Sequence, residues 1–490
     1  MMKSIIKKGL YLSILGLSVI CTVVSSCAED EGNYEYIETK EISVSLDDQY
    51  VVEQFENLVI SPVFNKQIPL NTSEYRYLWY LWNSESSIPD TICTEQNINI
   101  PIKYSPGKYY MCFEIQNKDG VVVSLNLANL SVVNSNSNGL AVLSNVEGEA
   151  EITFISKKGK ITKEIYNSVN GERAGRSPVC LVYMGSEGYV IPTIGIGCSS
   201  GSVVAATSDF QFLSMLKDQI YFPPEKCVLQ ALKRDLSEMY EYAIIDGGIY
   251  SRNIMYSSSP NSMFDTRVGG NDYELSPFII EASGSSPTIF DRKSGRFMWD
   301  YYGDLLPVGI PETTTLFNPL NVNGDLIYAT SFKAEGDNML SRYENIRGVI
   351  RLNNGSLFAF GALMVEGYDA NWNRVHTLTP SHRMDIPAEA TSFGCSIIEP
   401  NFIFYSVGNV IFCKSIATGN IISQIDLGQK IDYMEFDRMD PSILYVGISN
   451  SSSKSDSGSV VSMTMSSDGE LSENVRYQNV CGKVVDFETK

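Results

Sequence analysis

VIRLNNGSLFAF, residues 349–360, is the stretch that decides the fold. Its two short apolar segments, 349–352 and 357–360, flank the turn Asn353-Asn354-Gly355. Asn and Gly tolerate the positive φ angles that a tight hairpin turn requires. The stretch therefore predicts an antiparallel β-hairpin, and a chain assembled from such hairpins is expected to be all-β.

Similar glycine turns recur between short apolar strands in the C-terminal part of the chain. Besides 353–355, they lie at residues 157–159, 246–248, 292–295, 323–325, 417–420 and 466–469. The roughly 350 residues from Gly139 onward accommodate seven or eight four-stranded blades of about 45 residues each. We therefore expect a seven- or eight-bladed β-propeller over residues 140–490. A tandem of β-sandwiches is the alternative, and it would require long loops where this chain has evenly distributed turns.

Helix is expected to be scarce. Ser208 is placed to cap a short helix that runs to Leu216, with Phe210 and Leu213 on its apolar face. Residues 227–242 fit both a helix and a strand, because their apolar spacing is helical at first and alternates towards the end.

Residues 41–133 alternate with the period of two that half-buried strands show. The stretch YRYLWYLW, residues 75–82, is the clearest example. About ninety residues with a tryptophan-bearing central strand predict an immunoglobulin-like β-sandwich. Cys93 follows the tryptophans rather than preceding them, so the disulfide pattern of antibody domains is absent. Residues 134–139, NSNSNG, have the composition of a linker to the propeller.

The first 26 residues are expected to be a secretory signal peptide. Three lysines, Lys3, Lys7 and Lys8, precede an apolar run over residues 9–24. This run is too short and too asymmetric in charge for a stable membrane span. Small side chains stand before Cys27, as in a bacterial lipobox, where the thiol of the cysteine receives diacylglycerol. A membrane anchor with an incidental cysteine is the alternative.

Cleavage before Cys27 would leave a lipidated tether over residues 27–40. The next four residues, Ala28, Glu29, Asp30 and Glu31, are small and then acidic. This pattern resembles the surface-export signal of Bacteroidetes lipoproteins. The resemblance implies a protein that is lipid-anchored in the outer membrane and faces the cell exterior. The alternative is a solvated acidic leader that faces the periplasm.

The charge and the cysteines exclude several classes of function. The formal net charge is −20, and an acidic surface repels phosphate backbones, so nucleic-acid binding is not expected. The eight cysteines beyond Cys27 form no CxxC motif and no cluster with histidine, so no metal site and no cofactor are predicted. Buried free thiols are the expected state. Cys93 and Cys112 are the one pair proposed for a disulfide, because both fall in the N-terminal domain.

No catalytic residue is predicted. GCSSG, residues 197–201, matches the nucleophile-elbow pattern G-x-S-x-G, but no strand-to-helix turn is expected around it. His376 and His382 are the only histidines, and their separation of six with an intervening proline does not suit a helical metal site. We expect them in a surface loop.

Carboxylates are plentiful around FMWDYYGD, residues 297–304. A hydrolase that cleaves glycans on a propeller would need two of them at a set distance. The simpler expectation is that they are acidic loop residues that favour solubility. The candidates are Asp291, Asp300, Asp304 and Glu312.

Aromatic residues are the stronger functional indication. Trp299, Tyr301 and Tyr302 form one group, and Tyr368 and Trp372 form another. Flat apolar rings beside hydrogen-bonding groups suit sugar stacking or a protein hot spot. Trp299 is also well placed to be a core strand residue. Tyr368 and Trp372 are expected to be exposed and to contact a ligand or partner.

The order of these parts resembles the PKD-like lipoproteins of Bacteroidetes. The family's usual tether is similar to GNYDY, and Glu35 departs from it conservatively. The WDFGDG run of true PKD repeats is missing. The resemblance rests on the lipobox cysteine, GNYEY at 32–36, the aromatic strand around Trp79, PGKY at 106–109 and GLAVL at 139–143.

The resemblance implies partners as well as a fold. Such lipoproteins belong with SusC-like TonB-dependent transporters and SusD-like lipoproteins. It therefore implies a non-catalytic accessory in the import of oligosaccharides or peptides at the outer membrane. The alternatives are a surface hydrolase that acts on glycans or peptides, and an adhesion or scaffold protein.

Overall fold

The computed structural model describes most of the chain from residue 42 to its last residue. The described ranges are 42–53, 56–64, 75–83, 88–104, 106–133, 138–184, 192–234, 240–254, 263–280, 286–301, 303–310, 316–334, 342–450 and 454–490. They divide into two compact units. The first ends at Ser131, and the second comprises Val132–Lys490 with two short earlier segments, Glu53–Phe55 and Ile102–Gly107.

The N-terminal domain is a β-sandwich around one buried tryptophan. A five-stranded sheet has the order β2-β9-β8-β5-β6, and two pairs, β1-β4 and β3-β7, complete the domain. The strands are β1 (Val44–Ser45), β2 (Gln49–Glu53), β3 (Asn57–Ile60), β4 (Val63–Phe64), β5 (Tyr75–Trp82), β6 (Asp90–Cys93), β7 (Ile98–Pro101), β8 (Gly107–Asn117) and β9 (Val122–Val133).

Trp79 explains why the sequence alternates as it does. On β5 the side chains of Tyr77, Trp79 and Leu81 are buried, while their neighbours stay partly accessible. The Trp79 ring lies 4.4 Å from that of Phe113 on β8, and its indole N–H donates to the backbone oxygen of Glu95 at 3.0 Å. Burying a large ring while satisfying its polar atom is what a tryptophan requires in a core.

The disulfide proposed for Cys93 and Cys112 is not formed. Both are free thiols. Cys93 is on β6 and Cys112 is on β8, and β5 lies between these two strands in the sheet. The cysteines therefore lie on strands that are not neighbours, although they belong to one domain as expected.

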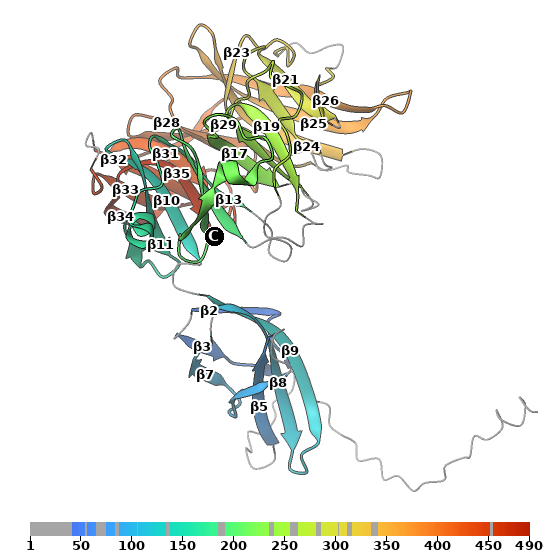
Figure 1. Ribbon diagram of the computed structural model, residues 1–490, viewed down its shortest axis with the longest axis vertical. Helices are drawn as coiled ribbons and strands as arrows, with labels where there is room; N and C mark the ends of the chain where they lie inside the picture. Colours follow the sequence, from blue (N-terminus) through green and yellow to red (C-terminus); the bar gives the residue numbers. More distant parts are fainter. Residues whose placement is uncertain are drawn as a thin grey trace, which may run out of the picture. The chain divides into compact units, whose positions relative to one another are not determined.

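The C-terminal unit is a β-propeller whose described residues form seven sheets (Figure 1). Five sheets have four strands and two have three. The sequence predicted seven or eight blades, and the residues that the structure describes form seven. Neighbouring strands pair antiparallel in every blade, and six of the seven predicted glycine turns join two paired strands. The turn predicted at residues 323–325 is wrong, because Gly324 begins β23 after a connection from the preceding blade.

The strands of the first three blades follow the chain, except that the first blade also takes the last strand of the chain. They are β10 (Gly139–Val146), β11 (Glu149–Ser156) and β12 (Ile161–Thr162) with β35 (Lys483–Thr489); β13 (Pro178–Met184), β14 (Thr193–Cys198), β15 (Val203–Ala206) and β16 (Phe212–Met215); and β17 (Leu229–Arg234), β18 (Tyr240–Ile245) and β19 (Gly248–Asn253).

The remaining four blades are built entirely from consecutive strands. They are β20 (Thr288–Asp291), β21 (Arg296–Tyr301) and β22 (Asp304–Pro307); β23 (Gly324–Lys333), β24 (Arg342–Leu352), β25 (Leu357–Tyr368) and β26 (Arg374–Ile386); β27 (Phe393–Gly394), β28 (Phe402–Val407), β29 (Val410–Ser415) and β30 (Ile421–Asp426); and β31 (Lys430–Phe436), β32 (Ile443–Ser449), β33 (Gly458–Met465) and β34 (Leu471–Cys481).

Two short helices occur in the described part of the propeller, α2 (Ile165–Asn170) and the 3₁₀ helix η1 (Leu216–Gln219). The helix expected over residues 208–216 is wrong. Phe212–Met215 instead form β16, which pairs with β15, and Phe210 is buried in a left-handed conformation before it. Sheet pairing has overridden a local helical spacing.

Strand β35 closes the ring of blades. It pairs antiparallel with β10, with Leu140 opposite Thr489, and so completes the first blade with the last strand of the chain. Gly139 and Lys490 exchange backbone hydrogen bonds of 2.9 and 3.0 Å beyond the ladder. Contacts from β27 to β31, from β31 to β35, from β35 to β13 and from β13 to β17 show that these are the inner strands, which face the propeller axis.

A glycine on β32 sets how closely the seventh blade approaches this closing strand. A Cβ atom added at Gly447 would stand 2.3 Å from Cβ of Val484 on β35. We therefore expect Gly447→Ala to destabilise the propeller by about 2 kcal/mol, the usual cost of overpacking. Chemical unfolding of the purified protein measures this.

Gly394→Ala is the matched control, because its added Cβ would make only ordinary contacts, with Phe436 at 3.4 Å as the nearest. Equal stability of the two variants would contradict close packing at the closing strand.

Candidate functional site

Several residues predicted from the sequence lie outside the described residues. They are the proposed lipidation site Cys27, the proposed export signal Ala28, Glu29, Asp30 and Glu31, the aromatic Tyr302 and the acidic Glu312. The other four aromatic candidates are described. Trp299 and Tyr301 lie on β21, and Tyr368 and Trp372 lie at the end of the β25–β26 hairpin.

The first aromatic group packs against the β25–β26 hairpin just below its tip, because His376 lies two residue pairs from the Tyr368–Arg374 pair that ends the ladder. The Trp299 ring stacks on the imidazole of His376, with centroids 4.0 Å apart and planes inclined by 12°. Tyr301 packs edge-on against Trp299 at 5.2 Å. Trp299 is 2% exposed, which confirms that it is a core residue. The backbone N–H of Gly309 donates to the carbonyl oxygen of His376 at 2.6 Å, which ties β26 to the segment after β22.

The surface loop expected for the two histidines is wrong. Both lie on β26, and His376 is fully buried. Its position alternates with Leu378 and Pro380, which face the same way and are also buried. This period of two was the signal in the sequence that could have placed His376 on a strand.

Charged groups surround the imidazole. Across the β25–β26 ladder Glu366 stands opposite His376, and a carboxylate oxygen of Glu366 lies 3.6 Å from His376 Nε2. Arg374 donates from Nε to the other oxygen of Glu366 at 2.6 Å. Burial, with a smaller contribution from Arg374, lowers the pKa of His376 to about 3. The imidazole is therefore neutral at physiological pH and cannot supply a charge for binding.

Three of the four acidic candidates lie in strands rather than in loops, and two of these three are buried. Asp291 is 1% exposed, and its carboxylate accepts the backbone N–H groups of Glu274 and Lys293, both at 3.1 Å. Asp300 is also buried, and burial raises its pKa, although a hydrogen bond from the backbone of Gly303 opposes the shift. Asp304, at the start of β22, is exposed as expected. Asp291 and Asp300 therefore serve turns and packing rather than solubility.

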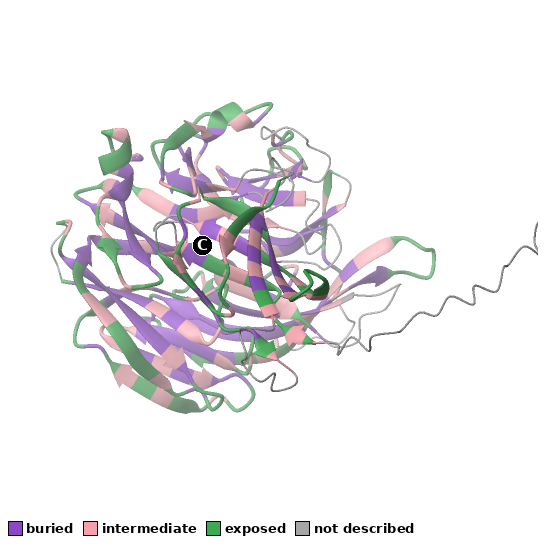
Figure 2. Ribbon diagram, turned by 90° about the horizontal axis from the view of Figure 1, so that it is seen from below, coloured by how far each residue is buried: buried purple, intermediate pink, exposed green. Residues whose placement is uncertain are grey.

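The tip of the β25–β26 hairpin presents two exposed aromatic rings. Tyr368 is 52% exposed and Trp372 is 72% exposed, as the sequence predicted. Their centroids are 6.0 Å apart and their planes are inclined by 48°. The hairpin extends beyond the rest of the propeller in both views, and its end is exposed (Figures 1 and 2). The rings are thus held away from the blades on a projecting support.

Asp369 holds the turn between these rings. Its Oδ1 accepts the backbone N–H groups of Asn371 and Asn373, both at 2.8 Å, and its Oδ2 accepts the side-chain amide of Asn373 at 3.1 Å. Hydrogen bonds from Asn373, from its backbone first and then its side chain, lower the pKa of Asp369. The carboxylate stays ionised and its acceptors are used inside the turn.

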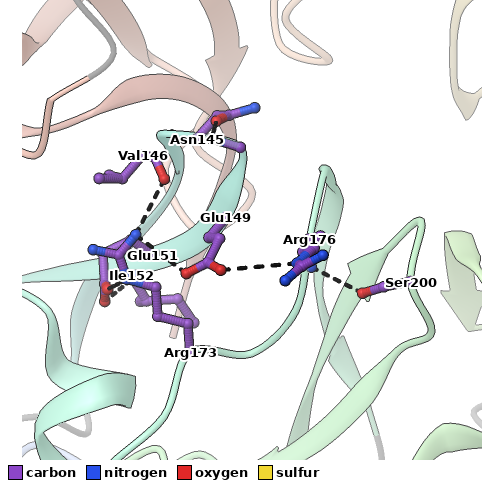
Figure 3. Close-up of polar contacts among 9 residues, drawn as sticks. Asn145, Val146, Glu149, Glu151, Ile152, Arg173, Arg176 and Ser200 are labelled. Carbon is purple, nitrogen blue, oxygen red and sulfur yellow. Dashed lines mark hydrogen bonds and ion pairs between the residues drawn. The ribbon is translucent and has the colours of Figure 1, made fainter.

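The G-x-S-x-G motif has a structural setting that differs from a nucleophile elbow. Residues 197–201 run from the end of β14 through a tight turn into β15, which is a strand and not a helix. The hydroxyl of Ser200 accepts the backbone N–H of Arg176 at 2.8 Å (Figure 3). Ser199, at the nucleophile position of the motif, is exposed on the turn.

A group of charges lies beside this turn (Figure 3). Arg173 lies 3.5 Å from carboxylate oxygens of both Glu149 and Glu151, and Arg176 lies 3.9 Å from the second oxygen of Glu149. Glu151 is 2% exposed, and burial raises its pKa to about 7. Arg173 also donates to the backbone oxygen of Val146 at 3.1 Å. The group ties the end of β10 and β11 to the segment that precedes β13.

Acidic residues that sequence reasoning missed meet at the inner strands. On β35, Asp486 accepts the backbone N–H of Leu181 at 2.7 Å, and Glu488 accepts that of Tyr183 at 2.9 Å. Both donors belong to β13, the inner strand of the neighbouring blade. The carboxylates therefore satisfy backbone groups at the open edge of that strand and join the first blade to the second.

The seventh blade contributes a third carboxyl group. Tyr433 on β31 donates its hydroxyl to Glu435 at 3.1 Å. Desolvation by the surrounding protein first, and then the charge of Asp486, raises the pKa of Glu435 above its usual range, although its side chain remains accessible to solvent. Burial also raises the pKa of Asp486 to about 6 and that of Glu488 to about 7. The signal in the sequence was the alternation of Asp486 and Glu488 along an otherwise apolar strand.

Neither a metal centre nor a membrane-spanning helix is found in the part of the chain that the structure describes. Within those ranges, no group of three or more His, Cys, Asp or Glu side chains is arranged to hold a metal ion. No described helix has the length and apolar character needed to cross a membrane.

Comparisons with known proteins support the N-terminal assignment. Residues 27–178 match the PKD-like family, and this range includes the sandwich and the first strands of the propeller. No curated protein matches the chain in sequence.

Several solved structures resemble the chain in fold. A protein from Lactobacillus plantarum is 11% identical, with 72% of this chain and 99% of that chain covered and a TM-score of 0.46. The β-propeller domain of Cps50 (Swd1) from Myceliophteria thermophila is 9% identical, with coverage of 64% and 91% and a TM-score of 0.41. Sqt1 from Saccharomyces cerevisiae is 9% identical, with coverage of 63% and 87% and a TM-score of 0.39.

The buried ion pair just below the hairpin tip supports a prediction. We expect Arg374→Met to destabilise the protein by about 3 kcal/mol, because it leaves the Glu366 carboxylate buried without its partner. The double variant Arg374→Met with Glu366→Leu is expected to recover most of this loss, since no unpaired charge remains. Thermal and chemical unfolding of the three proteins measures both effects. A double variant as unstable as the single one would contradict the assignment of the loss to an unpaired charge.

The carboxyl groups at the inner strands support a second prediction. Folding raises the pKa values of Glu435, Asp486 and Glu488 above the value of about 4 that carboxyl groups have in unfolded chains. The folded state therefore binds protons more tightly, and its stability falls as the pH rises from about 4 to 7. We expect Glu435→Gln to reduce this fall, because it removes one of the three groups whose pKa folding raises.

Unfolding by denaturant at several pH values measures this effect. Glu470→Gln, at an exposed turn position, is the matched control and should keep the slope of the parent protein. Measurements should stop near pH 7, because burial lowers the pKa of Lys490 to about 7 and its loss of a proton acts with the opposite sign above that pH. Identical slopes in all three proteins would contradict the prediction.

Proposed function

We propose that this protein is a surface-anchored, non-catalytic accessory that binds or assembles other proteins. A PKD-like domain followed by a β-propeller is a scaffold suited to that role. The observation that carries the proposal is the pair of exposed rings, Tyr368 and Trp372, on a projecting hairpin. Aromatic residues that are exposed on a rigid support are typical of binding hot spots.

The rigidity of the support is part of the argument. The part of the hairpin just below the tip is fixed by the stack of Trp299 on His376 and by the pairing of Glu366 with Arg374. A contact group that is already fixed in its binding conformation loses less conformational entropy when it binds. A tip on this support can therefore engage a partner without first being ordered.

The anchor and the partners complete the proposal. The lipobox around Cys27 favours a lipid anchor in the outer membrane, with the body of the protein facing the cell exterior. Several acyl chains hold such a protein firmly, because each buried methylene contributes about 0.8 kcal/mol. The resemblance of the chain to PKD-like lipoproteins favours a SusC-like TonB-dependent transporter and a SusD-like lipoprotein as partners. Their cargo would be an oligosaccharide or a peptide.

The carboxyl groups at the inner strands do not favour the hydrolase alternative. Asp486 and Glu488 accept backbone N–H groups of the neighbouring blade, which gives them a structural role. A glycosidase pair needs one carboxyl group to protonate the leaving oxygen and another to act as base or nucleophile. Turnover of a glycan or peptide by the purified protein, lost in Glu435→Gln, would establish the hydrolase instead.

The anchor is tested by changing the thiol that would be acylated. We expect Cys27→Ser to move the protein from the membrane fraction to the soluble fraction and to abolish its co-purification with the transporter after detergent extraction. Loss of the acceptor thiol removes the acyl chains and with them the membrane affinity. Cys21→Ser is the matched control and should leave both properties unchanged. Intact protein of unacylated mass in the membrane fraction would contradict the lipid anchor.

A further inference from the structure

Five hairpin turns of this chain share one geometry. In each, the first residue donates its N–H to the carbonyl of the fifth, and the fourth donates to the carbonyl of the first. The fourth residue always has a positive φ. The first and fifth residues are Asn117 and Val121, Ser156 and Lys160, Leu352 and Ser356, Ser466 and Glu470, and Asp369 and Asn373.

The fourth position is glycine in four of these turns and tryptophan in the fifth. The glycines have φ values between 77° and 88°, and Trp372 has a φ of 63°. In this left-handed region Cβ approaches the following carbonyl oxygen, so glycine is the residue that fits without strain. The residues at the fourth position of the five turns are Gly120, Gly159, Gly355, Gly469 and Trp372.

The turn itself does not require the tryptophan. Asp369 Oδ1 accepts two backbone N–H groups, as Asn117 Oδ1 does in the β8–β9 turn, where the fourth residue is Gly120. The core does not require it either, because the indole is 72% exposed. A strained, exposed aromatic residue that serves neither the turn nor the core indicates a function at the tip.

We propose that Tyr368 and Trp372 form a recognition knob that inserts into an apolar pocket of a folded protein partner. The proposal deepens the proposed function and rests on it, because it names the class of partner that the exposed rings contact. Trp and Tyr dominate the energetics of protein interfaces because they bury large rigid surfaces at low entropic cost.

The polar groups of the tip favour a protein over a glycan. Sugar binding adds directed hydrogen bonds from carboxylates or amides to the stacking of rings. Here both carboxylate oxygens of Asp369 are used inside the turn, and Glu366 is buried and paired with Arg374. The tip also lies at the end of a projecting hairpin (Figures 1 and 2), and a projecting aromatic group fits a pocket on the partner.

The charge of the tip disfavours a membrane surface. Asp369 is ionised and lies between the two rings in sequence, and the chain as a whole carries a net charge of −20. Anionic headgroups repel such a surface, and desolvating the Asp369 carboxylate in the bilayer interface is costly. A protein pocket can receive the indole while Asp369 remains in water.

Site-specific photocrosslinking in the cells that make the protein tests the class of partner. The full-length chain carries p-benzoylphenylalanine in place of Trp372, and a second version carries it in place of Gly355, the same position of the neighbouring β24–β25 turn. We expect the first to crosslink to a defined peptide of one protein and the second to give no such product. A lipid or glycan adduct at 372, or equal products at both positions, overturns the proposal.

The identified protein, purified, is then used to measure affinity. We expect Trp372→Gly to lower the affinity of the full chain roughly thirtyfold, the effect of losing a hot spot. The melting temperature of the Trp372→Gly variant should equal or exceed that of the parent protein, because glycine suits the left-handed position. Trp372→Phe should recover part of the affinity. Binding by Trp372→Gly within twofold of the parent protein overturns the proposal.

The outcomes separate this inference from the importer assignment. A crosslinked protein that is neither SusC-like nor SusD-like, with the affinity loss in Trp372→Gly, supports the knob and refutes the importer assignment. Co-purification of the transporter in equal amounts with Trp372→Gly and with the parent protein, together with no protein crosslinked at position 372, supports the importer and overturns the knob.

Discussion

The propeller depends on satisfying the open edges of its inner strands. A blade can pair its strands with one another, but the edge that faces the axis keeps unpaired backbone N–H groups. At the junction of the first two blades, side chains satisfy these N–H groups. Asp486 and Glu488 of β35 accept hydrogen bonds from the backbone N–H groups of Leu181 and Tyr183. The strand that carries both carboxylates is also the strand that closes the ring through its ladder with β10. One seven-residue strand, β35, therefore both closes the ring of blades and supplies the hydrogen-bond acceptors for the open edge of β13.

The closed ring of blades is a rigid support for the projecting β25–β26 hairpin. The β25–β26 hairpin has the longest strands of its blade, of 12 and 13 residues, whereas β23 and β24 have 10 and 11. A buried stack of Trp299 on neutral His376 and an ion pair fix the hairpin just below its tip, and the tip itself holds two exposed rings. Burial decides the roles of otherwise similar residues, since Trp299 in the core contributes stability and Trp372 at the tip is available for contact.

Much of the fold could be read from local patterns. The turn at Gly355 and the two strands beside it appear in the structure as the hairpin that the sequence predicted, with Ile350 opposite Phe358. Of the candidate site, the exposed pair was predicted and so was the burial of Trp299. The missed features share one cause, which is that they join residues far apart in the chain. His376 is buried because β21 covers it, and Phe212–Met215 are a strand because β15 offers a partner.

The sequence by itself determined the alternation of strands and turns, the all-β class and the division into a sandwich and a propeller. These follow from side-chain periodicity and from the φ angles that glycine and asparagine allow, which are properties of neighbouring residues. Only the tertiary structure decided that there are seven blades, that β35 returns to β10, and that three acidic side chains from β31 and β35 gather at the inner strands. Those outcomes depend on closing a ring of fixed size, and ring closure is a property of all the blades together.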